Sequence, residues 1–101
     1  MEAAGRCMKL LGKNHLTSFA DKYSDSRSAL SVWEREVEAI AWASPADLKQ
    51  RYPSASLVGK DNVVFNIGGN KYRLHARVSY TTGVVIVVRI GTHREYDKWV
   101  F

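Results

Sequence analysis

The stretch that decides the fold is 71–80, which reads KYRLHARVSY. Its even positions are apolar or aromatic: Tyr72, Leu74, Ala76, Val78 and Tyr80. Its odd positions are polar: Lys71, Arg73, His75, Arg77 and Ser79. Successive side chains of a strand point to opposite faces, so this alternation predicts a strand with one apolar face. The other face carries three cations and a histidine about 6.6–7 Å apart, close to the step between phosphates of a nucleic-acid strand.

This basic face has two interpretations. An antiparallel sheet often exposes one charged face to water, where the charge only maintains solubility. Such a face usually mixes signs, however, and no acid lies among the three cations of 71–80. The net charge of +5 is also concentrated here, because 59–101 carry seven Lys and Arg against three Asp and Glu, a net of +4. The pattern therefore favours a polyanionic partner such as nucleic acid.

The segments around this strand predict a sheet preceded by helices. Strands are expected at 56–58, at 62–67 and at 84–90, the last apolar enough to be covered on both faces, with turns at Gly68-Gly69 and at 81–83. Apolar side chains recur at helical spacing in 15–23 and in a longer segment that runs to about Ala43. Ser44 and Pro45 start a further helix that ends before Pro53, and the capping-box pattern at 92–95 starts a short helical turn. The expected fold is α+β, with two to three N-terminal helices on a three- to four-stranded antiparallel sheet and a short C-terminal helical turn.

Length and composition fit one domain. The chain has 101 residues, and we expect a single domain at 8–101 preceded by a disordered extension at 1–7. A lone Cys7 excludes a disulfide framework and a zinc ribbon. The longest apolar run, 84–88, is far shorter than the ~20 residues of a membrane-spanning helix. These features predict a cytoplasmic protein with no membrane contact.

Four separated motifs resemble the HigB family of bacterial toxins. They read WASPADLK at 42–49, YPSAS at 52–56, VFNIGGNKYRL at 64–74 and GTHREYDK at 91–98, and the resemblance covers the chain from about residue 8. It implies a RelE-like fold and a ribosome-dependent mRNA endonuclease. It also implies a cognate HigA-type antitoxin with a helix-turn-helix domain, and binding to operator DNA only through the antitoxin complex. His75 stands where the family is expected to have an apolar residue, so no family role carries over to it.

The chemistry expected of such an endonuclease works without a cofactor or metal. The three histidines, His15, His75 and His93, are widely separated in the sequence, and no cysteine pair or close carboxylate cluster accompanies them. The remaining route is attack of the ribose 2′-OH on the adjacent phosphate, which needs a base, an acid and a cation.

We predict His93, Tyr96 and Arg73 as the catalytic residues. Histidine has an unperturbed pKa near 6.5, and a position at a helix start would favour its neutral form and attract phosphate. Tyr96 could transfer a proton, stack on a base or simply pack against Trp99, while Asp97 could orient His93 or cap the terminal turn. Arg73 and Arg77 would clamp the phosphorane, because a guanidinium matches phosphate oxygens.

The predicted RNA-binding residues are Lys71, Arg77, Asn70, Arg89, Arg94, Lys98 and Lys60. Turn geometry explains Asn66 and Asn70 as well as RNA contact does. Trp33 and Trp42 are expected in the core or facing the antitoxin, and His15 is expected to have no active role.

Two other functions stay open on the sequence. The fold also suits a non-catalytic binding module that inhibits a protein target such as gyrase, since relatives with it include gyrase poisons. The chain could also be an inactive relic of a toxin.

Overall fold

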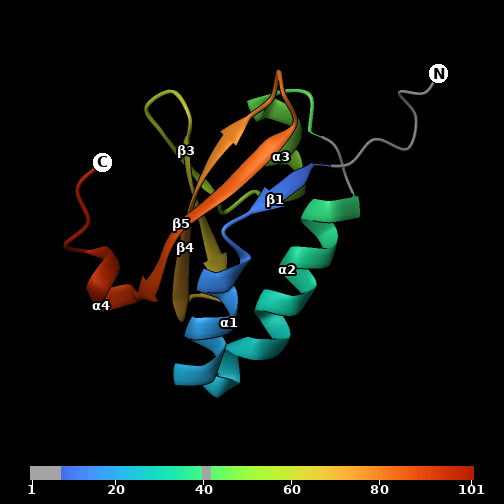
Figure 1. Cartoon of the computed structure of the whole chain (residues 1–101). Coiled ribbons are helices and arrows are strands. Elements are labelled where there is room, and N and C mark those ends of the chain that lie inside the picture. Colours follow the sequence, from blue (N-terminus) through green and yellow to red (C-terminus); the bar gives the residue numbers. More distant parts are fainter. Residues whose placement is uncertain (1–7, 40–41) are drawn as a thin grey trace.

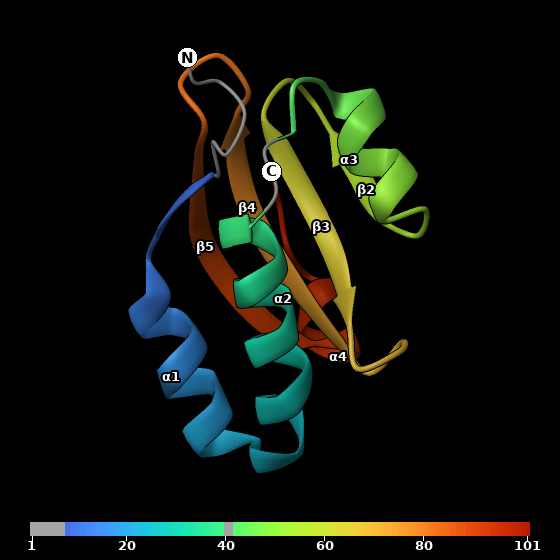
Figure 2. The same ribbon diagram turned by 90° about the vertical axis from the view of Figure 1, so that its right-hand side faces the viewer.

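The computed structural model describes residues 8–39 and 42–101, so the predicted extension at 1–7 lies outside the described residues. One five-stranded sheet, in the order β1-β5-β4-β3-β2, carries α1 and α2 on one face (Figures 1 and 2). The C-terminal α4 and the residues after it lie on the opposite side of the sheet (Figure 1). In chain order the elements are β1 Lys9–Leu11, α1 Lys13–Lys22, the 3₁₀ turn η1 Ser24–Ser26, α2 Arg27–Ala39, α3 Pro45–Arg51, β2 Ser56–Val58, β3 Asn62–Ile67, β4 Tyr72–Ser79, β5 Val84–Thr92 and α4 His93–Tyr96.

The α+β class is confirmed, as are the local signals that start α3 and α4. The helices α1 to α3 precede the strands β2 to β5 as expected, but β1 comes before all of them. The Ser44 side chain accepts a hydrogen bond from the Asp47 backbone N–H at 3.2 Å and so caps α3. Thr92 and Glu95 cap α4 reciprocally, as the capping-box pattern predicts. The strands expected at 56–58 and 62–67 form with those bounds.

The predicted strand count of three to four was wrong, because β1 adds a fifth strand and makes the sheet mixed. β1 pairs in parallel with β5, with Lys9 opposite Val84 and Leu11 opposite Ile86. Three residues are too few to show an alternating pattern, and their partners lie some 75 positions further along the chain. No local signal in the sequence therefore marks this strand.

The core lies between the sheet and the helices α1 and α2. It takes Phe19, Leu30, Trp33 and Val37 from the helical segments and the even positions of β4 from the sheet. Trp33 and Trp42 are both buried in it, 2% and 3% exposed. The sequence left open whether they belong to the core or face the antitoxin, and the structure shows them in the core. No helix in the described ranges 8–39 and 42–101 is long and apolar enough to cross a bilayer.

The expectation that β5 is covered on both faces was wrong for its first half. Val85 and Val87 are buried toward the helices, but Ile86, on the other face, is 41% exposed. A bulge follows at Val88, because His75 pairs with Arg89 whereas Ala76 pairs with Val87. The residues after α4 reach the outer face beyond this bulge, at Arg89, and leave Ile86 uncovered.

Gly12 is the joint between β1 and α1, and its backbone has a φ of +80°. A Cβ at this position would lie 2.7 Å from the Val87 carbonyl oxygen of β5. The close approach of the two backbones therefore requires glycine here for space as well as for conformation.

Replacing Gly12 tests whether the close approach to β5 requires glycine. We expect Gly12→Ala to lower the free energy of unfolding by more than the roughly 1–2 kcal/mol that a left-handed backbone costs an alanine. Gly59→Ala is the matched control, because Gly59 has a φ of +62° and a Cβ added there would have no atom within 4 Å. Urea unfolding of both variants measures the difference, and equal losses would contradict a steric role for the Val87 carbonyl.

Candidate active site

Pairing of β4 with β5 sets the geometry of the candidate site. Tyr72 lies opposite Thr92, and Arg73 lies opposite Gly91, so the start of β4 is adjacent to the start of α4. The predicted alternation of β4 is confirmed, because Tyr72, Leu74, Ala76 and Val78 belong to the helix-side core. Arg73, His75 and Arg77 consequently share the outer face of the sheet.

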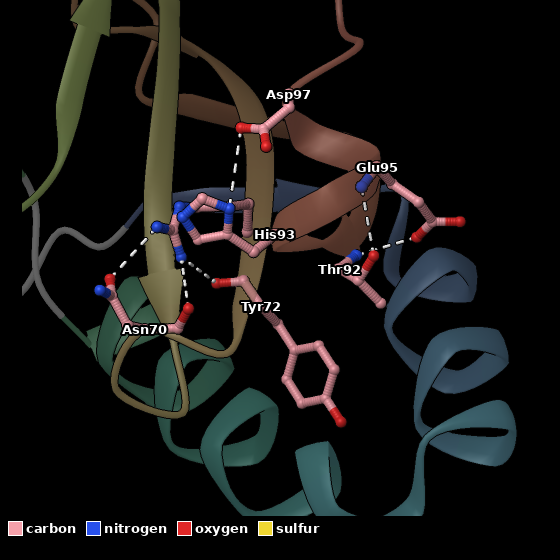
Figure 3. A network of polar contacts seen from close by, with 7 residues as sticks. Asn70, Tyr72, Thr92, His93, Glu95 and Asp97 are labelled. Carbon is pink, nitrogen blue, oxygen red and sulfur yellow. Dashed lines mark hydrogen bonds and ion pairs between the residues drawn. The ribbon is translucent and has the colours of Figure 1, made fainter.

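Arg73 is a buried cation on this face, near the start of β4. The residue is only 7% exposed, and its guanidinium donates hydrogen bonds to the Asn70 backbone oxygen at 3.0 Å and to Asn70 Oδ1 at 3.2 Å (Figure 3). A third bond at 3.3 Å goes to the Tyr72 backbone oxygen. All three acceptors are neutral, and within 8–39 and 42–101 no carboxylate forms an ion pair with Arg73. A guanidinium held in this way keeps its full positive charge, because none of its three acceptors is an anion.

The three residues predicted as catalytic come together around the Tyr96 ring. The Arg73 guanidinium carbon lies 5.4 Å from the centre of that ring, and the His93 ring lies perpendicular to it with centroids 6.3 Å apart. His93 Nδ1 is 3.7 Å from Asp97 Oδ1, so a protonated imidazole would face a carboxylate (Figure 3). The His93 side chain is 53% exposed and accessible to a substrate.

Gly91 and Trp99, for which the sequence predicted no role in the site, hold this arrangement in place. A Cβ on Gly91 would lie 2.9 Å from Trp99 Cζ2 and 3.1 Å from the Glu95 Cβ. The absence of a side chain at Gly91 therefore lets α4 and Trp99 pack directly on β5, opposite Arg73. Gly91 is part of the motif at 91–98, but its spatial role depends on the pairing of β4 with β5.

Two of the three cations in 71–80 have acidic partners, contrary to the interpretation of the sequence, in which no acid accompanied them. Lys71 forms an ion pair with Asp25 of η1, and Arg77 Nη2 lies 3.2 Å from Asp61 Oδ2 in the turn before β3. The Lys71 ammonium and then the Tyr72 hydroxyl, which donates to Asp25 at 2.5 Å, hold the pKa of the Asp25 carboxyl below its ordinary value. Both acids come from other segments, so the alternation of one strand could not reveal them.

Some of the other predicted RNA-binding residues lie near Arg73 and some lie far from it. Asn70 supports Arg73, while Arg94 and Lys98 are exposed on and just after α4. Arg89 contacts His75 and the Val100 backbone. Lys60 precedes β3, at the end of this strand opposite the Gly68-Gly69 turn. Because β3 has six residues, each rising about 3.3 Å, Lys60 lies roughly 20 Å from the site. Arg77 lies four positions from Arg73, roughly 13 Å away on the same face, so it does not join the cluster as a second phosphate clamp.

His75 is a buried polar residue with both ring nitrogens occupied. Nε2 donates to Asn62 Oδ1 at 2.8 Å, and Nδ1 accepts from Arg89 Nε at 3.1 Å, which defines the neutral Nε2–H tautomer. Burial first, and then the charges of Arg89 and Arg77, lower the pKa of His75 to about 4. His75 thus serves as a neutral bridge between β3 and β5.

This pKa predicts a loss of stability in acid. Between pH 6.5, near the pKa of an unfolded histidine, and pH 4, the unfolded chain binds a proton that the folded chain does not, so the free energy of unfolding falls. Urea unfolding at pH 7, 5.5 and 4 measures this fall. In His75→Gln, whose side chain does not titrate, the part of the pH dependence due to this residue is expected to disappear. An unchanged slope between pH 6.5 and 4 in the variant would contradict the assignment.

No group of three or more histidine, cysteine, aspartate or glutamate side chains in the described part of the chain could hold a metal ion. The geometry of the cluster itself suits an oxyanion, because a buried guanidinium, a phenol and an imidazole lie together, and the nearby Asp97 carboxylate contacts His93 and forms no ion pair with Arg73.

Comparison with known proteins identifies the family of the chain. Residues 26–99 match the HigB_toxin family model, described as the RelE-like toxic component of a toxin-antitoxin system. The mRNA interferase toxin HigB of Escherichia coli strain K12 is 28% identical over 92 residues, which cover 89% of this chain and 88% of that protein. The mRNA interferase HigB of Shigella flexneri matches equally, and that of Escherichia coli O6:H1 strain CFT073 is 26% identical over 93 residues, or 90% of each chain.

The fold and the family match define a RelE-like toxin of a toxin-antitoxin system. Within that class, the chain belongs to the HigB toxin family.

Proposed function

We propose that the chain is an mRNA endoribonuclease that cleaves messages at the ribosome. The observation that carries this proposal is the buried guanidinium of Arg73, which has only neutral acceptors among the described residues and faces Tyr96. Its relatives are named mRNA interferases, which supports mRNA as the substrate. A buried cation costs free energy unless an anion completes its environment, and an RNA phosphate is such an anion.

The residues present support a metal-independent cleavage by the 2′-OH. Neutral His93 takes the proton of the 2′-OH, whose oxygen attacks the adjacent phosphorus, while the phenol of Tyr96 gives its proton to the departing 5′-oxygen. The P–O5′ bond breaks, and the products are a 2′,3′-cyclic phosphate and a 5′-hydroxyl. Arg73 stabilises the negative charge of the phosphorane, and Asp97 stabilises the imidazolium that forms on His93.

The proposed partners follow from the place of the family in a toxin-antitoxin system. A HigA-type antitoxin with a helix-turn-helix domain neutralises the toxin, and operator DNA is bound only through that complex. The protein acts in the cytoplasm, where its substrate is mRNA on the ribosome. Exposed Arg94 and Lys98, beside the cluster, are the residues proposed to contact the RNA backbone directly.

Substitution of the cluster tests the assignment. We expect His93→Ala and Arg73→Gln each to slow message cleavage by about 10²–10³-fold and to abolish growth arrest when the protein is induced in bacteria. Arg35→Gln is the matched control, because it removes an exposed arginine from α2, on the helix side of the sheet. Mapping of message 5′ ends measures cleavage, and thermal unfolding verifies that each variant is folded. Full cleavage by both folded variants would remove these residues from the mechanism.

The same mapping separates the proposal from its alternatives. DNA breaks with intact messages would indicate an inhibitor of gyrase, and harmless overexpression in several hosts would indicate an inactive relic. A pair of reporter messages, with and without a ribosome-binding site, tests whether cleavage requires the ribosome. We expect new 5′ ends only in the translated message, and equal cleavage of both would contradict ribosome dependence.

A further inference from the structure

Residues 99–101 pack on the outer face of the sheet, beside the candidate active site. Trp99 lies over Gly91, Arg89 Nη2 donates to the Val100 backbone oxygen at 3.1 Å, and the Phe101 ring meets the His75 ring edge-on with centroids 4.7 Å apart. This segment covers His75 and lies opposite the helices (Figure 1). It forms a second, smaller layer on the sheet.

Arg89 lies against both aromatic side chains of this layer. Its guanidinium carbon is 4.6 Å from the centre of the Trp99 ring and 5.3 Å from that of Phe101, while Nε donates to His75 at 3.1 Å. These contacts hold a cation against both rings. The rings themselves are not fully covered, because Phe101 is 47% exposed and Trp99 is half-buried.

The layer is continuous with the catalytic cluster. The Trp99 and Tyr96 rings are perpendicular with centroids 5.6 Å apart, and Tyr96 in turn lies against Arg73. Along β4, the step from Arg73 to His75, which Phe101 covers, is about 6.6–7 Å. A nucleotide next to the one held by Arg73 would therefore reach Trp99 and Phe101.

We propose that Trp99 and Phe101 form a base-stacking subsite for the nucleotide adjacent to the scissile phosphate of single-stranded RNA. The inference rests on the proposed endoribonuclease function and adds a binding site to it. Unpaired bases stack on aromatic side chains, and nearby arginines hold the backbone. Arg89 contacts both rings, and the exposed Lys98 precedes Trp99 directly. These charges favour a nucleic acid over an apolar protein segment as the occupant.

The test uses the full chain and an RNA that cannot be cut. A 2′-O-methyl adenylate hexamer lacks the nucleophilic hydroxyl, and an abasic hexamer offers the same phosphates without bases. We expect the adenylate to quench the tryptophan emission of the protein and the abasic hexamer to leave it unchanged. Trp99→Phe should remove the quenching, because the other two tryptophans, Trp33 and Trp42, are buried in the core.

Substitutions at Phe101 separate stacking from simple apolar contact. Phe101→Leu is expected to weaken binding of the adenylate hexamer by about tenfold, whereas Phe101→Tyr, which keeps the ring, binds as wild type does. Leu57→Ala is the matched surface control, since Leu57 is similarly exposed on β2 and its neighbour in the pairing, Val63, belongs to the helix-side core. Thermal unfolding checks each variant.

Three outcomes would overturn the subsite: no quenching by the adenylate, equal quenching by the abasic hexamer, or wild-type affinity in Phe101→Leu. The last would leave Phe101 as a surface for a protein partner such as the antitoxin. Because the probe cannot be cleaved, these results do not depend on catalysis. Failure of the proposed function is seen separately, as the absence of new message 5′ ends on induction.

Discussion

The site depends on the register between β4 and β5. In this register Arg73 is opposite Gly91 and Tyr72 is opposite Thr92, so the first residues of β4 meet the first turn of α4. A slip of one residue would turn every side chain of β4 to the other face and send the guanidinium into the helix-side core. The apolar side chains of Leu74, Ala76 and Val78 prevent this slip, because they are buried only in the observed register. The hydrophobic face of the strand therefore positions the cation on its opposite face.

The parts of the fold that local sequence determines could be predicted, and those that depend on distant segments could not. Side-chain alternation located β4, and short-range capping chemistry located the starts of α3 and α4. The strand β1 could not be predicted, because only its pairing with residues 84–86 defines it. The catalytic candidates could be named from residue types and a family resemblance, but the packing of Trp99 on Gly91 could not. That contact joins positions eight apart across the start of a helix, and it exists only once α4 folds back on the sheet.

Contacts with distant segments also change how the positive charge of 71–80 is interpreted. Counted along the chain, Lys71, Arg73 and Arg77 look equivalent, yet Lys71 and Arg77 each have an aspartate partner supplied by another segment. Exposed pairs of this kind contribute little stability, but they reduce the local attraction for a polyanion. Arg73 differs, because its three acceptors are neutral and the residue is buried. For the proposed binding of an RNA phosphate, the net charge of the strand therefore matters less than the burial of this one guanidinium.

The length of α4 shows why the cluster depends on side chains and not on a helix dipole. A position at a helix start was expected to favour neutral His93 and to attract phosphate, but α4 has only four residues, so few peptide dipoles add together. Its capping box also occupies backbone donors, since the Glu95 N–H donates to Thr92 Oγ1 and the Thr92 N–H donates to Glu95 Oε1. In the proposed mechanism the charge for a phosphate therefore comes from Arg73, whose guanidinium carbon lies 5.4 Å from the centre of the Tyr96 ring. Because Tyr96 also packs against Trp99, a movement of this one ring would affect both Arg73 and the neighbouring aromatic layer.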